Sequence, residues 1–396
     1  MGVAWGAFAP GVLAQGQTRA TTGDALPRDV HADSRSRLPL LVRDALDAQD
    51  RKTYDTAIAA NARSGGLEAA AILRAHGSGS AVRWQSPLGR PLTELAILVT
   101  GREHDQPYEW SLHQMEAMAV GLDPAVIEVI RLRKPITSLD DKQQAVVQLG
   151  HEMFTLHHVS AATYARALKT LGERNLVDVV DLMAGYAATA TRLTAFNQYL
   201  PPGWKQFLPL PFPPPDDIHP DSRSRLPLRT GNPDAPTPPA AASLYGRTLA
   251  PEGTGPAHIA RYGAGLKSLE AKVGRRTIAL TELLTARALQ SQYAWTILEP
   301  IAARDGVEPE VVKVVRDAGG LQGLSEHDAA LIQFSRELLG RHFVAAPTYK
   351  RMARWLEDRD LADLVNVIAQ HVADIALLTA FDQHLPAGQQ PLLPVR

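Results

Sequence analysis

Cysteine is absent from this sequence of 396 residues. Its absence excludes disulfides, thiolate nucleophiles, iron–sulfur clusters and thiolate zinc sites. A surplus of either charge is also lacking, because 41 basic and 42 acidic residues leave a net charge of −1. This balance creates no field that favours nucleic acid or an anionic membrane surface. No run approaches the apolar length that a membrane-spanning helix needs, so we expect no integral membrane segment.

The residues that are present are typical of a globular protein, with 45% hydrophobic and 21% charged side chains. The length favours two domains of ordinary size. The first residues, "MGVAWGAFAPGVLAQGQ", are apolar and end in small residues, but no Lys or Arg precedes the apolar run. This start favours a cleaved export signal, and therefore the periplasm, over a disordered or mis-started terminus of a cytoplasmic protein.

An internal repeat organises the chain. "HADSRSRLPL" at 31–40 returns as "HPDSRSRLPL" at 219–228, and "LTAFNQYLPPG" at 193–203 returns as "LTAFDQHLPAG" at 378–388. Beyond the first phrase the shift settles at 185 residues, as in the pairs Tyr108/Tyr293, Trp110/Trp295, His157/His342, Tyr164/Tyr349 and Phe196/Phe381. A constant shift across unrelated residue types indicates a duplicated domain.

A proline-rich stretch, "LPPGWKQFLPLPFPPPDD", separates the two copies. Proline at this density disfavours helix and favours an extended connection. We therefore divide the chain into a start with a candidate export signal (1–30), a first domain (31–205), a proline- and glycine-rich linker (206–256) and a second domain (257–396). Each copy is expected to carry its own core.

Both copies are predicted to be all-α. Ala145, Val146, Leu149 and Met153 recur at three- and four-residue intervals, the period of an amphipathic helix. The next helix should begin after Ser160 and stop at Gly172. Two further helices, "RPLTELAILVTG" and "QPYEWSLHQMEAMAVG", should form a hairpin because few residues join them. Period-two alternation is nowhere sustained, so strands should be scarce.

The candidate site lies on this hairpin. Glu109 and His113 are four residues apart and share one helix face, while Glu94 on the preceding helix can point into the same crevice. A carboxylate beside an imidazole can orient the imidazole or keep it charged near neutral pH. The alternative is a surface pair without function, which is common at this spacing.

Other candidates lie nearby. His104, Asp105, Glu109 and His113 cluster in the sequence as a possible metal set, but they lack the paired histidine spacing of a zinc helix, so metal-free chemistry ranks first. Tyr108, Trp110 and His157 are candidates to line a substrate pocket. All three recur in the second copy, which equally favours a structural role.

The stretch "ELAILVTGREHDQPYEWSLHQMEAMAVGLDPAVIEVIR", followed by "HHVSAATYARALKTLGERNLVDVVDLMAGYAATA", resembles the carboxymuconolactone decarboxylase family, which has the alkylhydroperoxidase D fold. The second copy resembles it equally. The resemblance covers roughly 90–205 and 275–390 and implies two tandem helical domains of that fold. In the hydroperoxidase branch, Glu94 and His113 would take the Glu and His positions, and Gln106 and Glu109 the positions of two cysteines. Without thiolates, thiol peroxidase chemistry is excluded.

The decarboxylase branch, as the resemblance implies, uses neither cysteine nor a cofactor. It implies a lyase or isomerase acting on a small carboxylated lactone or unsaturated acid, with His113 as general acid/base, Glu109 as its partner and Glu94 as an orienting carboxylate. Relatives form symmetric rings, which implies a homo-oligomer. We expect no nucleic-acid or membrane partner, no metal and no cofactor.

In the second copy, the shift of 185 places Ala279, Ala294 and Leu298 at the three candidate positions. The loss of all three together indicates one site that was duplicated and then lost once. The alternatives are a non-catalytic binding or scaffold protein of the same fold, and a metal-assisted hydrolase.

Overall fold

The computed structural model describes residues 26–46, 79–229 and 255–394, with a few single positions between 48 and 58. This part of the chain contains fourteen α-helices, two short 3-10 helices and no strand, so the predicted all-α class is confirmed. The candidate export signal, up to residue 25, and residues 230–254 of the linker lie outside the described residues.

The helices repeat along the chain. Those of the first copy are α3 (Gly79–Gln85), α4 (Arg90–Glu103), α5 (Pro107–Ala119), α6 (Pro124–Arg131), α7 (Asp141–Phe154), α8 (Ala161–Leu171) and α9 (Glu173–Ala195), with 3-10 turns η1 (Arg43–Ala45) and η2 (Ile136–Ser138). Those of the second are α10 (Gly255–Ala260), α11 (Leu266–Ala288), α12 (Gln292–Arg304), α13 (Pro309–Arg316), α14 (Glu326–Gly340), α15 (Ala346–Met352) and α16 (Asp358–Ala380). At the shift of 185, the bounds of α5, α6 and α9 coincide with those of α12, α13 and α16.

Local sequence signals set the ends of these helices. The hydroxyl of Ser160 accepts a hydrogen bond from the backbone N of Thr163 at 3.2 Å and begins α8, as predicted. Gly172, with φ of 78°, ends α8 and precedes α9 in a conformation that favours glycine. The predicted end of α4 at Gly101 is wrong by two residues, because the helix continues to Glu103. The helix α5 passes close to Gly101, where a Cβ would lie in ordinary contact, 3.5 Å from the backbone N of Trp110.

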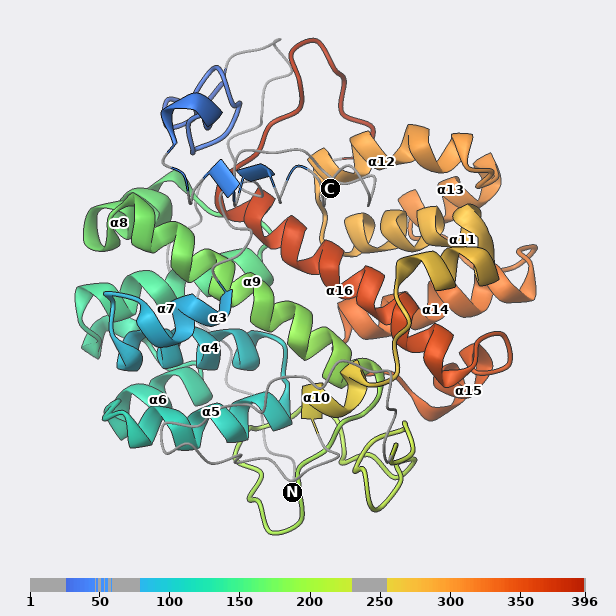
Figure 1. Cartoon of the computed structure of the whole chain (residues 1–396), viewed down its shortest axis with the longest axis horizontal. Coiled ribbons are helices and arrows are strands. Elements are labelled where there is room, and N and C mark those ends of the chain that lie inside the picture. Colours follow the sequence, from blue (N-terminus) through green and yellow to red (C-terminus); the bar gives the residue numbers. More distant parts are fainter. Residues whose placement is uncertain are drawn as a thin grey trace, which may run out of the picture.

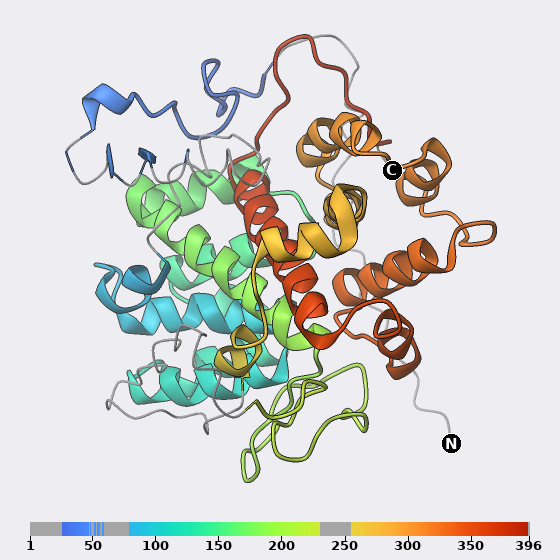
Figure 2. The same cartoon turned by 45° about the vertical axis from the view of Figure 1, so that its right-hand side comes forward.

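The last helix of each copy forms the centre of the molecule. α9 and α16 lie side by side and run in opposite directions (Figures 1 and 2). The other helices of each copy lie to either side, except that α10 of the second copy packs against α9 of the first. α16 is long and apolar enough to span a membrane by length and composition, with a mean hydropathy of 1.5, so the expectation that no run approaches this length is wrong. Burial in the core explains this apolar character, because 83% of the most apolar 18-residue stretch of the helix is buried inside the protein.

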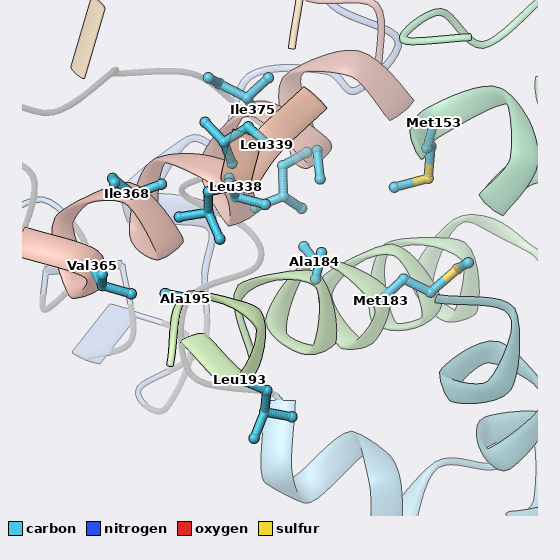
Figure 3. Close-up of a cluster of buried hydrophobic side chains, with 14 of the residues drawn as sticks. Met153, Met183, Ala184, Leu193, Ala195, Leu338, Leu339, Val365, Ile368 and Ile375 are labelled. Atoms are coloured by element: carbon cyan, nitrogen blue, oxygen red, sulfur yellow. The ribbon is translucent and has the colours of Figure 1, made fainter. Parts of the chain in front are cut away.

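The buried apolar side chains of both copies form one continuous core. Figure 3 shows part of this core, with Ala184 and Ala195 of the first copy facing Leu338 and Val365 of the second. The expectation of a separate core in each copy therefore needs correction. The physical reason is that α9 and α16 are apolar nearly all round, so each must bury a second face, and each does so against the other.

The repeated SRSRLPL segments (34–40 and 222–228) cross between the copies. The backbone N of Arg37, in the first segment, donates to the carbonyl of Phe381 just after α16 at 2.8 Å, and its guanidinium donates to the carbonyl of Val159 at 2.9 Å. Arg225 in the second segment makes the reciprocal bonds, to Phe196 just after α9 at 2.8 Å and to Val344 at 2.7 Å. Each segment therefore ties the end of one copy's central helix to the other copy.

Candidate active site

The structure brings Glu94 and His113 into direct contact. Glu94 lies on α4 and His113 on α5, and the packing of this helix hairpin places Nδ1 of His113 2.7 Å from Oε2 of Glu94. Both side chains are buried, with exposed fractions of 0% and 3%. The two side chains predicted to approach one another therefore form a buried carboxyl–imidazole pair.

Two arginines hold the second oxygen of the same carboxylate. The guanidinium of Arg90 donates to Oε1 of Glu94 at 2.5 Å, and Arg83 on α3 donates to the same oxygen at 3.2 Å. Both guanidinium groups also lie on the ring of Trp84, at 4.2 Å for Arg90 and 4.6 Å for Arg83. Arg83 of α3 and Arg90 of α4 thus place two positive charges beside the pair.

These contacts determine which groups are charged. Burial alone would raise the pKa of Glu94, but His113, Arg83 and Arg90 outweigh it and lower this pKa to about 2. Burial lowers the pKa of His113, and the two arginines oppose the raising effect of Glu94. The two arginines therefore keep Glu94 as a carboxylate, and the lowered pKa of His113 favours a neutral imidazole. Since a carboxylate only accepts, the proton lies on Nδ1, and the lone pair lies on Nε2.

Glu109 is in a different environment. It is buried with an exposed fraction of 2%, and neither of its carboxyl oxygens has a hydrogen-bond partner among the described residues. Burial raises the pKa of Glu109 well above its usual value, which favours the neutral acid over the carboxylate. The prediction that Glu109 is the partner of His113 needs correction, because Glu94 takes that place.

Tyr186 completes the cluster and was not predicted. It comes from α9, and its ring meets the imidazole of His113 edge-on with centroids 4.9 Å apart. Burial raises the pKa of its hydroxyl, and the charge of Glu94 raises it further. A search confined to the α4–α5 hairpin could not find Tyr186, because it is 73 residues after His113 in the sequence.

Tyr108, Trp110 and His157 do not join this cluster. Tyr108 and Trp110 are fully buried, and Nε1 of Trp110 donates to Gln114 at 2.7 Å, which is a packing role. His157 follows α7 and lines a cavity between the two copies, together with His104. Gln106 caps α5 by accepting from the backbone N of Tyr108 at 2.9 Å.

The metal alternative gains no support from the arrangement of its candidate ligands. Nδ1 of His104 points to the carbonyl of Thr100 at 2.9 Å, and Asp105 pairs with Arg102. Over the ranges that the structure describes, no group of three or more His, Asp or Glu side chains is placed to hold a metal ion.

The second copy contains a different buried polar pair close to the equivalent positions. Ala279, Ala294 and Leu298 are buried, as expected for lost site positions. However, His371 stands at the position of Tyr186, and its Nε2 lies 3.7 Å from Oε1 of Glu282, one turn beyond Ala279. Burial raises the pKa of Glu282 to about 7 and lowers that of His371. Applying the shift of 185 to Tyr186 would have revealed this histidine.

Comparison with known proteins found no matching family model, no matching curated protein and no matching solved structure.

Proposed function

We propose that this protein is a cofactor-free lyase or isomerase that acts on a small carboxylated lactone or a similar unsaturated acid. The observation that carries the proposal is the contrast between Glu94 and Glu109. One is an ionised carboxylate that orients a neutral imidazole, and the other is a buried neutral acid. Carboxyl groups whose environments push their pKa values apart are typical of acid–base sites.

In this proposal Glu109 is the proton donor. For a decarboxylation, the bond between the substrate's carboxylate carbon and its ring breaks, and carbon dioxide leaves. The electron pair moves into the unsaturated lactone, and the protonated Glu109 gives its proton to the ring carbon. The resulting Glu109 carboxylate regains a proton from water, which balances the cycle.

His113 and the arginines position the substrate. Because Glu94 fixes the proton of His113 on Nδ1, the Nε2 atom can accept a hydrogen bond, or a proton in an isomerisation. Arg83 and Arg90 supply the positive charge that attracts a carboxylate substrate. The resemblance of this hairpin to the carboxymuconolactone decarboxylases agrees with such chemistry, and the lack of cysteine excludes the thiol-dependent branch.

The test is a release assay for carbon dioxide, combined with an absorbance assay for isomerisation, over a panel of small lactone acids and unsaturated diacids. On any substrate found, we expect Glu109→Gln and His113→Gln each to lower kcat by roughly 10² to 10⁴. Glu282→Gln is the matched control, since it alters a buried glutamate of the second copy and should leave this rate unchanged.

The outcome separates the alternatives. Full activity of Glu109→Gln in a chain that remains folded would discard the assignment of the proton donor. A folded wild-type chain that turns over nothing on the panel would favour the non-catalytic scaffold.

A further inference from the structure

A cavity of about 400 Å³ lies where the two copies meet. Its walls come from the ends of α4 and α7 in the first copy and from α11, α14 and α16 in the second. Figure 3 shows three of its apolar side chains, Met153 of the first copy and Leu339 and Ile375 of the second. The volume is within the range of small-molecule sites, which is about 300 to 1,000 Å³. Neither copy could form this seam cavity alone.

Aromatic rings converge on the seam cavity. The imidazoles of His104 and His342, one from each copy, stack with centroids 5.1 Å apart, and Phe154 meets His104 edge-on at 4.8 Å. His157, the counterpart of His342 at the shift of 185, also lines the cavity. His157 and His342 both have φ of 50°, so the same left-handed turn brings an imidazole from each copy to the cavity.

The seam cavity has both hydrogen-bond donors and acceptors, because Arg133 and Gln290 line it beside the imidazoles and Glu103. Nδ1 of His104 must donate to the carbonyl of Thr100, which leaves the lone pair on Nε2. Burial, together with repulsion among the three imidazoles, lowers the pKa of His342 to about 3 and also lowers that of His157. These rings are therefore neutral. Glu103 remains a carboxylate, since burial raises its pKa but His151, Thr155 and Arg133 lower it to about 2.

The seam cavity is distinct from the Glu94–His113 pair. Its lining includes Glu103 and His104 but not Glu94 or His113. Nine residues separate Glu94 from Glu103 along α4, which corresponds to about 13 Å at the rise of an α-helix. The charges around the two sites also differ. Two arginines lie beside Glu94 and His113, whereas the one arginine of the cavity, Arg133, has its Nη2 atom 3.8 Å from Oε2 of Glu103, which offsets its charge.

We propose that the seam cavity binds a small uncharged molecule with an aromatic ring and a hydroxyl group. The ring would pack against His104, His342 and the apolar side chains, and the hydroxyl would donate to an imidazole nitrogen or to Glu103. A carboxylate is disfavoured because Glu103 already offsets the charge of Arg133 and would repel a second carboxylate. The proposed ligand is uncharged, whereas the substrate proposed for the other site is an anion. The two proposals therefore stand independently.

The experiment titrates the full chain at pH 7 with 2-naphthol, and in parallel with 2-naphthoate, its anionic analogue, using probe fluorescence and calorimetry. We expect one 2-naphthol per chain and binding of 2-naphthoate at least tenfold weaker. His342→Gln should weaken 2-naphthol at least tenfold, whereas His158→Gln, at an exposed neighbour of the cavity residue His157, should not. Glu109→Gln should also leave 2-naphthol binding unchanged, which separates this site from the catalytic one.

Thermal melts confirm that each variant is folded. Should His342→Gln fail to fold, His104→Gln gives the same readout from the other copy. Unchanged binding of 2-naphthol in a folded variant of either histidine would overturn the proposal, as would no saturable binding to the wild type or tighter binding of 2-naphthoate.

Discussion

At the residue scale, two glutamates of neighbouring helices differ in charge because of their neighbours. Glu94 accepts from an imidazole and two guanidinium groups, whereas Glu109 lies against the backbone of Gly101 without a donor among the described residues. The same side chain is therefore stabilised as an anion in one place and as a neutral acid in the other. This contrast predicts opposite effects on stability.

Glu94→Gln should destabilise the protein at pH 8 by on the order of 3 kcal/mol, because a pKa unit is worth about 1.4 kcal/mol. The folded pKa of Glu94 lies below the unfolded value, so its contribution is present above pH 4.5 and is lost as the pH falls towards 2. Glu109→Gln should instead stabilise, since the raised folded pKa of Glu109 costs stability as the pH rises above 4.5. Urea unfolding at pH 3, 4, 6 and 8 measures both.

The control for this pair is Glu310→Gln on the exposed side of α13, which removes one surface charge only. The interpretation of the site would be wrong if Glu94→Gln and Glu109→Gln shifted the free energy of unfolding in the same direction at pH 8.

At the scale of the element, the start of α11 depends on a side chain from α16. Asp363 accepts from the backbone N of Ala264 at 2.8 Å and of Gly265 at 2.9 Å. Gly265, at the N-cap position, has φ of 97° and supplies no side chain to cap the helix. Asp363 therefore replaces a local cap with one provided by the tertiary structure.

Asp363→Ala should cost roughly 2 kcal/mol of stability, since it leaves two backbone donors without their carboxylate. Its counterpart at the shift of 185 is Asp178, whose pKa is raised by burial, so Asp178→Ala should cost less. Thermal melts of both variants, and amide hydrogen exchange at Ala264 and Gly265, provide the measurement. Equal losses in the two variants, without faster exchange at these amides, would argue against this capping role.

At the scale of the whole molecule, the two copies share one continuous core. α9 packs on α16, and the SRSRLPL segments cross between the copies. Arg37 and Arg225 each donate to carbonyls of both copies, which couples the halves through their backbones. The two copies should therefore lose their structure together.

Calorimetry should show a single unfolding transition whose calorimetric and van't Hoff enthalpies agree. Arg225→Met should lower its midpoint without splitting it, because the buried guanidinium is bonded to both copies. Two resolved transitions in the wild-type chain would show that each copy folds alone despite the shared core.

Much of the fold was determined by the sequence alone. The three- and four-residue spacing of Ala145, Val146, Leu149 and Met153 predicts a helix that the structure contains, as do Ser160 and Gly172 at the ends of α8. The constant shift of 185 predicts two sets of helices with matching bounds. These features are local, because periodicity, caps and repeats are properties of neighbouring residues along the chain.

The tertiary structure alone decided the charges and the partners. The four-residue spacing predicts that Glu109 contacts His113 on the same helix. In the structure, α4 packs on α5 so that His113 bonds to Glu94 instead. Glu109 is left without a hydrogen-bond partner among the described residues, and burial raises its pKa. Tyr186 and Arg83 joined the site, and Glu282 and His371 appeared in the copy expected to be empty. Charge states and hydrogen-bond partners depend on desolvation and on long-range contacts. Both are set by segments that are far apart in the sequence.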